Sequence, residues 1–267
     1  MILIYFQNSY IYSSMKKKNK KVNAAILVIG NEILSGRTQD KNVSYISTWL
    51  NNHCGISIKE VRIIPDVEKI IIKTVLDLSK KFTYVFTTGG IGPTHDDITS
   101  KSISRALKVE YKFNDEAYKI LENYYGKLNF NAPRQKMAKI PKGSKLIYNP
   151  SSAAPGFKIK NIFCLPGVPS ILQSMLPNIK KFIIRGLVIN DKSIYLNTVE
   201  SKIAKILTKL QNYFKRKIEI GSYPFFKSGK IGVAVVLRSS NKRDINKCSN
   251  LLLHIIKKNK IKILNFK

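Results

Sequence analysis

The chain of 267 residues is long enough for one large domain or for a main domain with a smaller partner, and an apolar content of 44% is enough to build a sizeable core. Its 47 basic and 16 acidic residues leave a net charge of +31, yet only 8 of the basic residues are arginine, the side chain on which base-reading proteins depend. The lysines are spread over every segment, which favours a solvated basic surface over a dedicated nucleic-acid groove. No run of 18 apolar residues occurs, so no membrane span is expected.

The N-terminus and the cysteines both bear on the cellular compartment. Residues 1–14 are apolar and aromatic, but no basic residues precede the apolar stretch and no small-residue cleavage site follows it, so a secretory signal is not expected. Met15 opens a lysine-rich run typical of a bacterial start, and residues 1–23 are interpreted as a mis-assigned start or a disordered extension. The cysteines lack the spacing of a metal or redox pair, which predicts buried thiols in a reducing cytoplasm: Cys54, Cys164 and Cys248.

From residue 24 to residue 128 the chain alternates between β-branched apolar runs and segments with helical periodicity. This pattern predicts strands at 24–29, 57–64 and 82–88. It predicts four helices: one at 40–51, one that follows Asp66, one that follows Asp96 or Asp97 and ends at about residue 107, and one at 115–128. Asp66, and either Asp96 or Asp97, are expected to cap the helices that follow them. Trp49 falls on an apolar helix stripe and is expected in the core. The alternation predicts a largely parallel sheet with helices on both faces.

After residue 131 the pattern changes to shorter elements. It predicts a helix or turn at 135–140, strands at 145–148 and 161–165 and a helix at 170–176. Beyond residue 177 it predicts strands at 193–199, 217–222 and 230–237 and helices at 201–214 and 242–257. The predicted fold is therefore a three-layer α/β/α domain over residues 24–180, followed by a small α+β module over residues 190–260.

Three loops at the carboxyl ends of predicted strands carry unusual residues: 30–36, 87–97 and 165–170. In open α/β sheets ligands bind at this edge, where backbone N–H groups and helix N-termini face outward. The middle loop is the strongest signal, because its glycines let the backbone approach a phosphate while its threonines add hydroxyl groups. The ligand-binding residues predicted there are Thr87, Thr88, Gly89, Gly90, Gly92, Pro93 and Thr94.

Carboxylates stand beside two of these loops. Adjacent Asp96 and Asp97 are unusual neighbours for a phosphate unless a divalent cation lies between them and the ligand, and hard oxygen ligands suit Mg²⁺ or Mn²⁺. The alternative is a glycine turn followed by an ordinary helix cap. Glu32 follows a buried strand and is interpreted as a metal ligand, a base or a simple helix cap. His95 is interpreted as incidental.

The motifs in these loops resemble the MoaB/Mog-like molybdopterin-binding domain, and most closely its CinA-like (competence/damage-inducible protein A) branch. The matching pieces are IGNEILSG at 29–36, Asn42, TTGGIGPTHDDIT at 87–99, NPSSAAPGF at 149–157 and LPGVPS at 165–170. The resemblance continues through Glu200 and through IGSYP at 220–224, which is similar to the second module of that branch and to the corresponding domain of FAD synthases. In all it covers residues 24–257.

This resemblance implies a three-layer α/β fold, a molybdopterin-like or adenine-dinucleotide-like ligand, and a pyrophosphatase that depends on Mg²⁺, Mn²⁺ or Co²⁺ and acts on ADP-ribose or FAD-like compounds. It also implies a homo-oligomer. It does not extend to the nicotinamide-nucleotide amidase domain of full-length CinA, so that activity is not expected. By position it assigns Glu32, Asp96 and Asp97 as acidic site residues and Gly89, Gly90 and Gly92 as the phosphate-binding turn. The remaining ligand-binding residues that it implies are those close to the substrate: Asn42, Pro155, Gly156, Pro166, Gly167, Val168 and Pro169.

Three functions follow as hypotheses. In the first, the chain is a cytoplasmic nucleotide pyrophosphatase in which Asp96, Asp97 and Glu32 hold a divalent metal that activates water. In the second, it is a non-catalytic pterin-binding protein of molybdenum-cofactor metabolism. The third, a nucleic-acid binder, rests on charge alone and has no aromatic-basic motif behind it, so no specific nucleic acid or membrane partner is expected.

Overall fold

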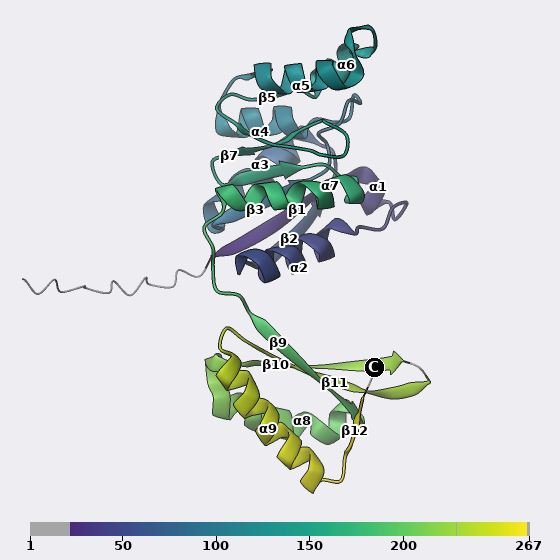
Figure 1. Cartoon of the computed structure of the whole chain (residues 1–267), viewed down its shortest axis with the longest axis vertical. Helices are drawn as coiled ribbons and strands as arrows, with labels where there is room; N and C mark the ends of the chain where they lie inside the picture. The colour runs from purple at the N-terminus through teal and green to yellow at the C-terminus, as the bar shows by residue number, and fades with distance from the viewer. Residues whose placement is uncertain (1–21, 228, 266–267) are drawn as a thin grey trace, which may run out of the picture.

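The computed structural model describes residues 22–227 and 229–265, which form two lobes joined at a narrow waist (Figure 1). The predicted N-terminal extension lies outside the described residues except for residues 22 and 23. No helix in the described ranges combines the length and the apolar character that a membrane crossing requires. The three cysteines are buried as free thiols, and burial raises the pKa of the Cys164 thiol to about 12, so this side chain stays protonated.

The first lobe is built on a six-stranded sheet in the order β2-β1-β3-β8-β7-β6. β1 pairs in parallel with β2 and β3, and β3 pairs in parallel with β8, whereas β7 is antiparallel to both of its neighbours. The predicted, mostly parallel sheet is therefore confirmed. The bounds of its strands are β1 (Asn23–Ile29), β2 (Ser57–Ile64), β3 (Tyr84–Thr88), β6 (Lys145–Ile147), β7 (Gly156–Ile159) and β8 (Ile162–Leu165).

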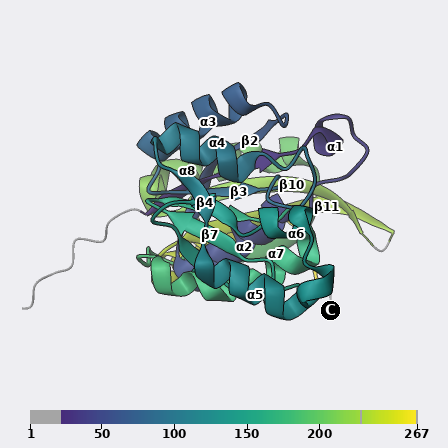
Figure 2. The same cartoon turned by 90° about the horizontal axis from the view of Figure 1, so that it is seen from above.

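Helices cover both faces of this sheet. Figure 2 shows α3 and α4 on one side and α2 and α7 on the other. The helices of this lobe are α1 (Asn31–Leu34), α2 (Asn42–Cys54), α3 (Glu68–Lys81), α4 (Thr99–Leu107), α5 (Asp115–Tyr125), α6 (Ala132–Lys136) and α7 (Pro169–Met175), with 3-10 turns η1 (Lys127–Asn129) and η2 (Leu176–Phe182). A separate two-stranded sheet pairs β4 (Tyr111–Phe113) with β5 (Lys139–Pro141).

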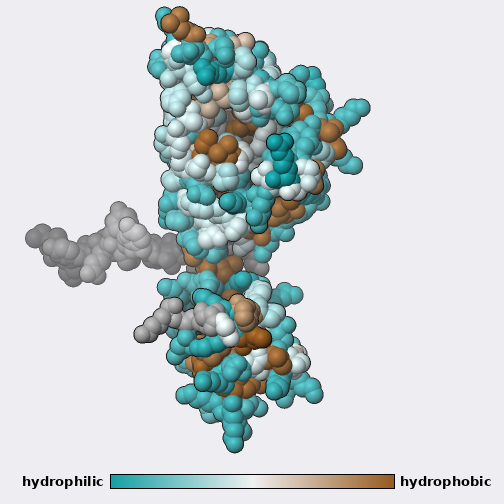
Figure 3. Space-filling view, turned by 90° about the vertical axis from the view of Figure 1, so that its right-hand side faces the viewer, coloured by the Kyte–Doolittle hydropathy of each residue, from teal (hydrophilic) through white to brown (hydrophobic). Residues whose placement is uncertain are grey.

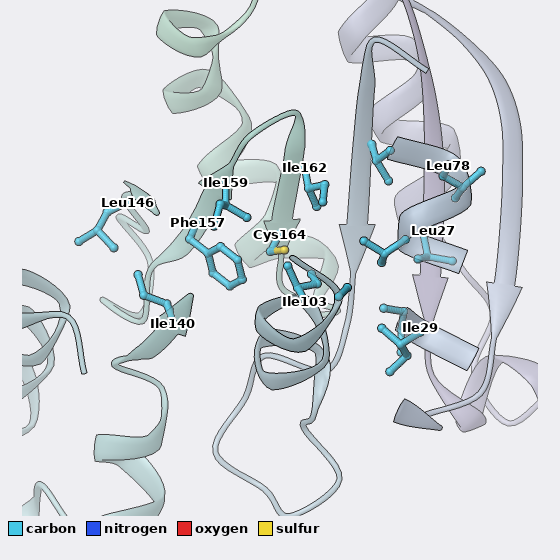
Figure 4. Close-up of a cluster of buried hydrophobic side chains, with 14 of the residues drawn as sticks. Leu27, Ile29, Leu78, Ile103, Ile140, Leu146, Phe157, Ile159, Ile162 and Cys164 are labelled. Carbon is cyan, nitrogen blue, oxygen red and sulfur yellow. The ribbon is translucent and has the colours of Figure 1, made fainter. Parts of the chain in front are cut away.

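The twofold period of β1 divides the core into two layers. Ala25, Leu27 and Ile29 face α3 and α4, and Figure 4 shows Leu27 and Ile29 in this layer with Leu78 and Ile103. The alternate residues of β1 pack on the other face with α2 and α7, where Trp49 is buried as predicted. Each fully buried aliphatic side chain contributes about 1.5–3 kcal/mol, so β1 is stabilised from both sides.

Two predicted helix caps are wrong. α3 begins at Glu68 after Val67, and no side chain caps it; Asp66 instead accepts a hydrogen bond of 2.9 Å from the backbone N–H of Asn31, at the start of α1. α4 begins at Thr99 and likewise has no side-chain cap, because Asp97 is turned back toward Thr94. Both aspartates therefore stabilise the loops at the edge of the sheet rather than the helices that follow them.

The second lobe is the predicted α+β module. Its four strands form an antiparallel sheet in the order β10-β11-β9-β12, and α8 and α9 pack with that sheet in one hydrophobic core. Its elements are β9 (Asn190–Asn197), α8 (Glu200–Phe214), η3 (Lys215–Lys217), β10 (Glu219–Lys227), β11 (Lys230–Ser239), α9 (Lys242–Lys258) and β12 (Lys262–Leu264). The connection between the lobes is held at Gly186, whose N–H donates to the carbonyl of Cys54 over 2.9 Å.

Ala153, in the loop before β7, has a φ of 62°, a left-handed conformation that costs an L-residue about 1–2 kcal/mol. Ala153→Gly should remove that strain and so raise the free energy of unfolding. The greater conformational freedom that glycine gives the unfolded chain offsets about 0.4–1 kcal/mol of the gain. We expect thermal unfolding to show a Tm higher by about 1–4 °C. The matched change Ala154→Gly, at a position without a positive φ, should lower Tm. A decrease for Ala153→Gly would contradict the assigned conformation.

Candidate ligand site

The three loops singled out in the sequence meet at one edge of the first sheet. β1, β3 and β8 are neighbours in register, with Val28 opposite Thr88 and Thr88 opposite Leu165, so their carboxyl ends lie side by side. The backbones are in close contact there. A Cβ on Gly89 would lie 2.1 Å from the carbonyl oxygen of Ile29, and one on Gly167 would lie 3.4 Å from the Cα of Gly89.

The middle loop turns sharply as it leaves β3. Gly89 and Gly90 have φ values of 96° and 69°, which favour glycine, and a Cβ on Gly90 would lie 2.1 Å from Oγ1 of Thr99. The carbonyl of Gly90 accepts a hydrogen bond from the N–H of Thr99, which joins the turn to the start of α4. The glycines are therefore required by the packing of the loop itself, in addition to any contact with a ligand.

The backbone donors of this loop are not equivalent. The N–H of Gly89 donates to the carbonyl of Leu165 over 3.2 Å and is already used by the sheet. The N–H groups of Gly90, Ile91 and Gly92 have no hydrogen-bond acceptor among residues 22–227 and 229–265. These three consecutive groups are the donors available to an anion at this edge.

A cleft of about 50 Å³ lies between the loops, with room for a few water molecules. Its lining includes residues from all three strand ends: Glu32, Asn42, Thr88, Gly89, Gly167 and Pro169. Nδ2 of Asn42 donates to the carbonyl of Gly167 over 2.7 Å, whereas its buried Oδ1 has no partner within the described residues. Asn42 thus fixes the third loop and leaves one acceptor for a ligand group or water.

The carboxylates of the middle loop differ in their surroundings. Oδ2 of Asp97 accepts hydrogen bonds from the backbone N–H and the hydroxyl of Thr94, at 2.8 and 2.5 Å, and closes a tight turn. Asp96 is exposed, and hydrogen bonding within the loop, from the side of Thr94 and from its own backbone amide, lowers the pKa of its carboxyl, as does the nearby positive charge of Lys136. Asp96 is therefore an exposed, fully ionised carboxylate.

Asp66 shows that the carboxylates share one edge. Partial burial raises the pKa of Asp66, and the negative charges of Glu32, Asp96 and Asp97 raise it further, while its hydrogen bond from Asn31 acts in the opposite direction. Sequence reasoning placed Asp66 at a strand-to-helix junction but interpreted it as a cap. Its position at the end of β2, next to β1 in the sheet, was the signal for a site residue.

These carboxylates do not form a metal site by themselves. Within the described part of the chain, no three His, Cys, Asp or Glu side chains are grouped closely enough to hold a metal ion. Glu32 lies against Gly30, where a Cβ would be 2.6 Å from its carboxylate, and Asp97 is turned toward Thr94. Mg²⁺ is commonly held by one or two carboxylates together with phosphate oxygens and waters, so this edge fits a cation only when a ligand supplies oxygens.

Lys136 is a residue of this site that sequence reasoning missed. It lies at the end of α6, and its Nζ donates to the carbonyl of Thr94 across the outer side of the loop. Forty-two residues separate the two positions, and no motif connects them in the sequence. The contact brings a positive charge near enough to Asp96 to help lower the pKa of that carboxyl.

The remaining predicted residues lie in different surroundings. Pro155 and Gly156 are buried, and a Cβ on Gly156 would lie 2.4 Å from the carbonyl oxygen of Cys164, so this glycine is needed by the packing of β7. Neither lines the cleft, and their contact with a ligand stays a prediction. Pro93 and Val168 are exposed. The face of the first lobe shown in Figure 3 is largely hydrophilic, with isolated apolar patches.

Comparison with known proteins identifies two family matches. Residues 25–185 match the family described as "Probable molybdopterin binding domain", and residues 189–264 match the family described as "FAD synthase, middle domain". The boundary between the matches falls between the two lobes.

Individual relatives support the same assignment. A protein of Archaeoglobus fulgidus is 34% identical over 74% of this chain and 84% of its own length, and a protein of Sulfolobus acidocaldarius is 31% identical over 87% of this chain and 94% of its own. The crystal structure of CinA from Thermoplasma acidophilum, a protein described as of unknown function, is 31% identical, with a TM-score of 0.56 over 61% of this chain and 99% of that one. These relatives are archaeal and do not support the expected bacterial origin.

Gly90→Val tests whether the middle loop binds the ligand. The added side chain would clash with Thr99 and disfavour the positive φ, at a cost of about 1–3 kcal/mol confined to the loop. We expect calorimetric titration with ADP-ribose and with a pterin analogue to show no binding to a folded variant. Gly126→Val is the matched control, because Gly126 also has a positive φ, of 73°, but a Cβ there would have no neighbour within 4 Å, and the residue lies after α5. Unchanged affinity in the Gly90 variant would move the binding site elsewhere.

Asp66→Asn tests the shared charge at this edge. Because the pKa of Asp66 is raised in the folded state, its ionisation costs stability once the pH exceeds the ordinary Asp range, and that cost is absent at lower pH. Asparagine keeps an acceptor for the N–H of Asn31, so we expect a Tm about 1–2 °C higher near pH 7 and no gain below about pH 4.

Asp77→Asn is the control of opposite sign. Hydrogen bonds from Lys81 and Arg62 lower the pKa of Asp77, so its charge stabilises the fold at neutral pH and this variant should have a lower Tm. If both variants have a lower Tm at pH 7, the hydrogen bond that Asp66 accepts from Asn31 stabilises the fold more than burial and the repulsion from neighbouring carboxylates destabilise it, and the prediction is contradicted.

Proposed function

We infer the function from one premise: the chain belongs to the family of molybdopterin-binding domains, and within it to the CinA-like branch. We propose that it is a divalent-metal-dependent pyrophosphatase that hydrolyses ADP-ribose or FAD-like nucleotides at the edge formed by β1, β3 and β8. The observation that carries this proposal is that the ionised carboxylate of Asp96 lies in the same loop as three backbone N–H groups that have no acceptor among the described residues, because phosphate binding and phosphate hydrolysis need both donors and a carboxylate.

Each part of the loop has a distinct role in this proposal. The N–H groups of Gly90, Ile91 and Gly92 bind a phosphate oxygen, and Lys136 offsets its negative charge from the outer side of the loop. Asp97 holds the turn in shape through Thr94.

The metal is part of the proposal. Asp96, Asp97 and Glu32 are its proposed ligands. Because these side chains are not grouped closely enough in the described structure to hold an ion by themselves, they would have to move together around the phosphates, which would supply the remaining oxygens with water. When bound, Mg²⁺, Mn²⁺ or Co²⁺ would offset phosphate charge and lower the pKa of a water molecule.

The choice of a nucleotide rather than a pterin rests on the second module. Its match to the middle domain of FAD synthase points to adenine-dinucleotide-like compounds. Non-catalytic binding of a pterin is the second candidate. It is favoured by the family description of the first domain and by the lack of a complete protein metal site among the described residues. A cytoplasmic homo-oligomer is the proposed setting in either case.

The direct experiment incubates the purified chain with ADP-ribose or FAD and each of Mg²⁺, Mn²⁺ and Co²⁺ and measures AMP release. Metal-dependent AMP formation supports the pyrophosphatase. If both compounds bind but none of the metals promotes AMP release, the pterin-binding candidate takes its place.

Asp97→Asn should reduce turnover by about 10- to 100-fold, because asparagine keeps an acceptor for Thr94 but removes the charge that a divalent cation needs. The Tm should change little. Asp115→Asn, an exposed change in the first turn of α5, is the control and should retain wild-type turnover. Normal turnover in the Asp97 variant would limit Asp97 to shaping the loop.

A further inference from the structure

A second cavity lies at the waist between the lobes, away from the cleft of the ligand site. It has a volume of about 350 Å³, within the range of small-molecule sites, which often occur where two domains meet. One wall comes from the beginning of β1 and β2, at the end of the parallel strands opposite the glycine-rich loop. The other wall comes from η3, the start of β10 and the end of β11. Figure 1 shows these segments on the two sides of the waist.

The lining of this cavity is strongly basic. It includes Lys59 from β2, Arg216 and Lys217 from η3, and Arg238 from β11, with Glu219 as the one carboxylate among the described lining residues. Glu219 lies 3.6 Å from Arg238 and is largely exposed. The other three cations form no ion pair with any residue in the described ranges. Among the described residues, four cations and one carboxylate line this cavity, which leaves a positive potential there.

The segments that carry these cations are fixed by hydrogen bonds. The buried Ser239 donates to the carbonyl of Lys217 over 2.6 Å, which joins the end of β11 to η3. Gln211, on α8, donates to the carbonyls of Lys215 and Ile218 and so holds η3 from the other side. The backbone beneath Arg216, Lys217 and Arg238 is therefore set before any ligand arrives, which lowers the entropic cost of binding an anion.

The choice of arginine at two positions is also informative. Lysine outnumbers arginine by 39 to 8 in this chain, and arginine offers a planar fork that binds phosphate through two hydrogen bonds. Arg62, Arg105 and Arg134 are engaged with carboxylate or carbonyl oxygens of the first lobe. Arg216 has no such partner among the described residues. Arg37, Arg185 and Arg243 have none there either, but of these four it is Arg216 that lines the cavity, with Arg238, which pairs with Glu219.

We propose that this cavity is a second binding site, specific for a small phosphorylated anion such as a nucleoside monophosphate. Arg216 and Arg238 bind the phosphate, Lys59 completes the contact from the first lobe, and the bound anion bridges the lobes. Carboxylates repel an anion, so Glu219 weakens binding. The site is separate from the proposed hydrolytic centre and does not depend on it.

The test is calorimetric titration of the full chain with AMP and with inorganic phosphate at fixed ionic strength, in the Gly90→Val background to remove binding at the first site. Arg216→Gln combined with Arg238→Gln should weaken AMP binding by about tenfold or more, the loss expected for charge-assisted hydrogen bonds. Glu219→Gln should strengthen it. Two binding events in the wild-type chain and one in the Gly90 variant would distinguish this site from the first.

The matched control combines Lys205→Gln with Arg243→Gln, which removes the same charge from exposed positions of the same module. It should leave AMP affinity unchanged. If the control weakens binding as much as the cavity variant, the anion responds to the general charge of the chain and the proposal is overturned. Unaltered affinity in the cavity variant overturns it as well.

Discussion

The close packing of three strand ends is the constraint on which the rest of the site depends. A Cβ on Gly89 would lie 2.1 Å from the carbonyl oxygen of Ile29, which leaves no room for a side chain, and a Cβ on Gly167 would be in van der Waals contact with the Cα of Gly89. Because β3 is central in the sheet, this packing brings the loops after β1 and β8 against the glycine-rich loop. The N–H of Gly89 donates a hydrogen bond to the carbonyl of Leu165, and the next three N–H groups have no acceptor among the described residues.

The loops at this edge carry several carboxylates and the ammonium group of Lys136. Burial and the negative charges of Glu32, Asp96 and Asp97 raise the pKa of Asp66, while Lys136 contacts the loop at the carbonyl of Thr94. Such a grouping of carboxylates costs folding stability, and proteins commonly accept that cost at functional sites. It also explains why a metal ion is proposed together with the ligand. The carboxylates and the phosphates are both negative, and a divalent cation would take oxygen ligands from each of them.

Much of this fold could be predicted from sequence because β1, β2 and β3 have long β-branched runs and α2, α3 and α9 have regular apolar stripes. Four short strands were not predicted: β4, β5, β7 and β12. Each has only three or four residues, too few for a period, and each depends on pairing with a partner far along the chain or across a turn.

The site was predicted at the level of its loops but not of its contacts. The three motifs sit at strand ends, where topology brings them together. The roles of Asp66 and Lys136 depend on neighbours 35 and 42 residues away, which local patterns do not encode. The caps were misassigned for a related reason: an aspartate before a helix is a good cap only when no other N–H competes for it, and Asn31 and Thr94 do compete.

The measurement that tests the central claim most directly is an amide NMR titration of the labelled chain with ADP-ribose. The account predicts that the largest shifts on binding occur at the N–H groups of Gly90, Ile91 and Gly92, while the N–H of Gly89, already bonded to Leu165, changes much less. Large shifts confined to other loops, with Gly90 to Gly92 unaffected by a bound ligand, would contradict it.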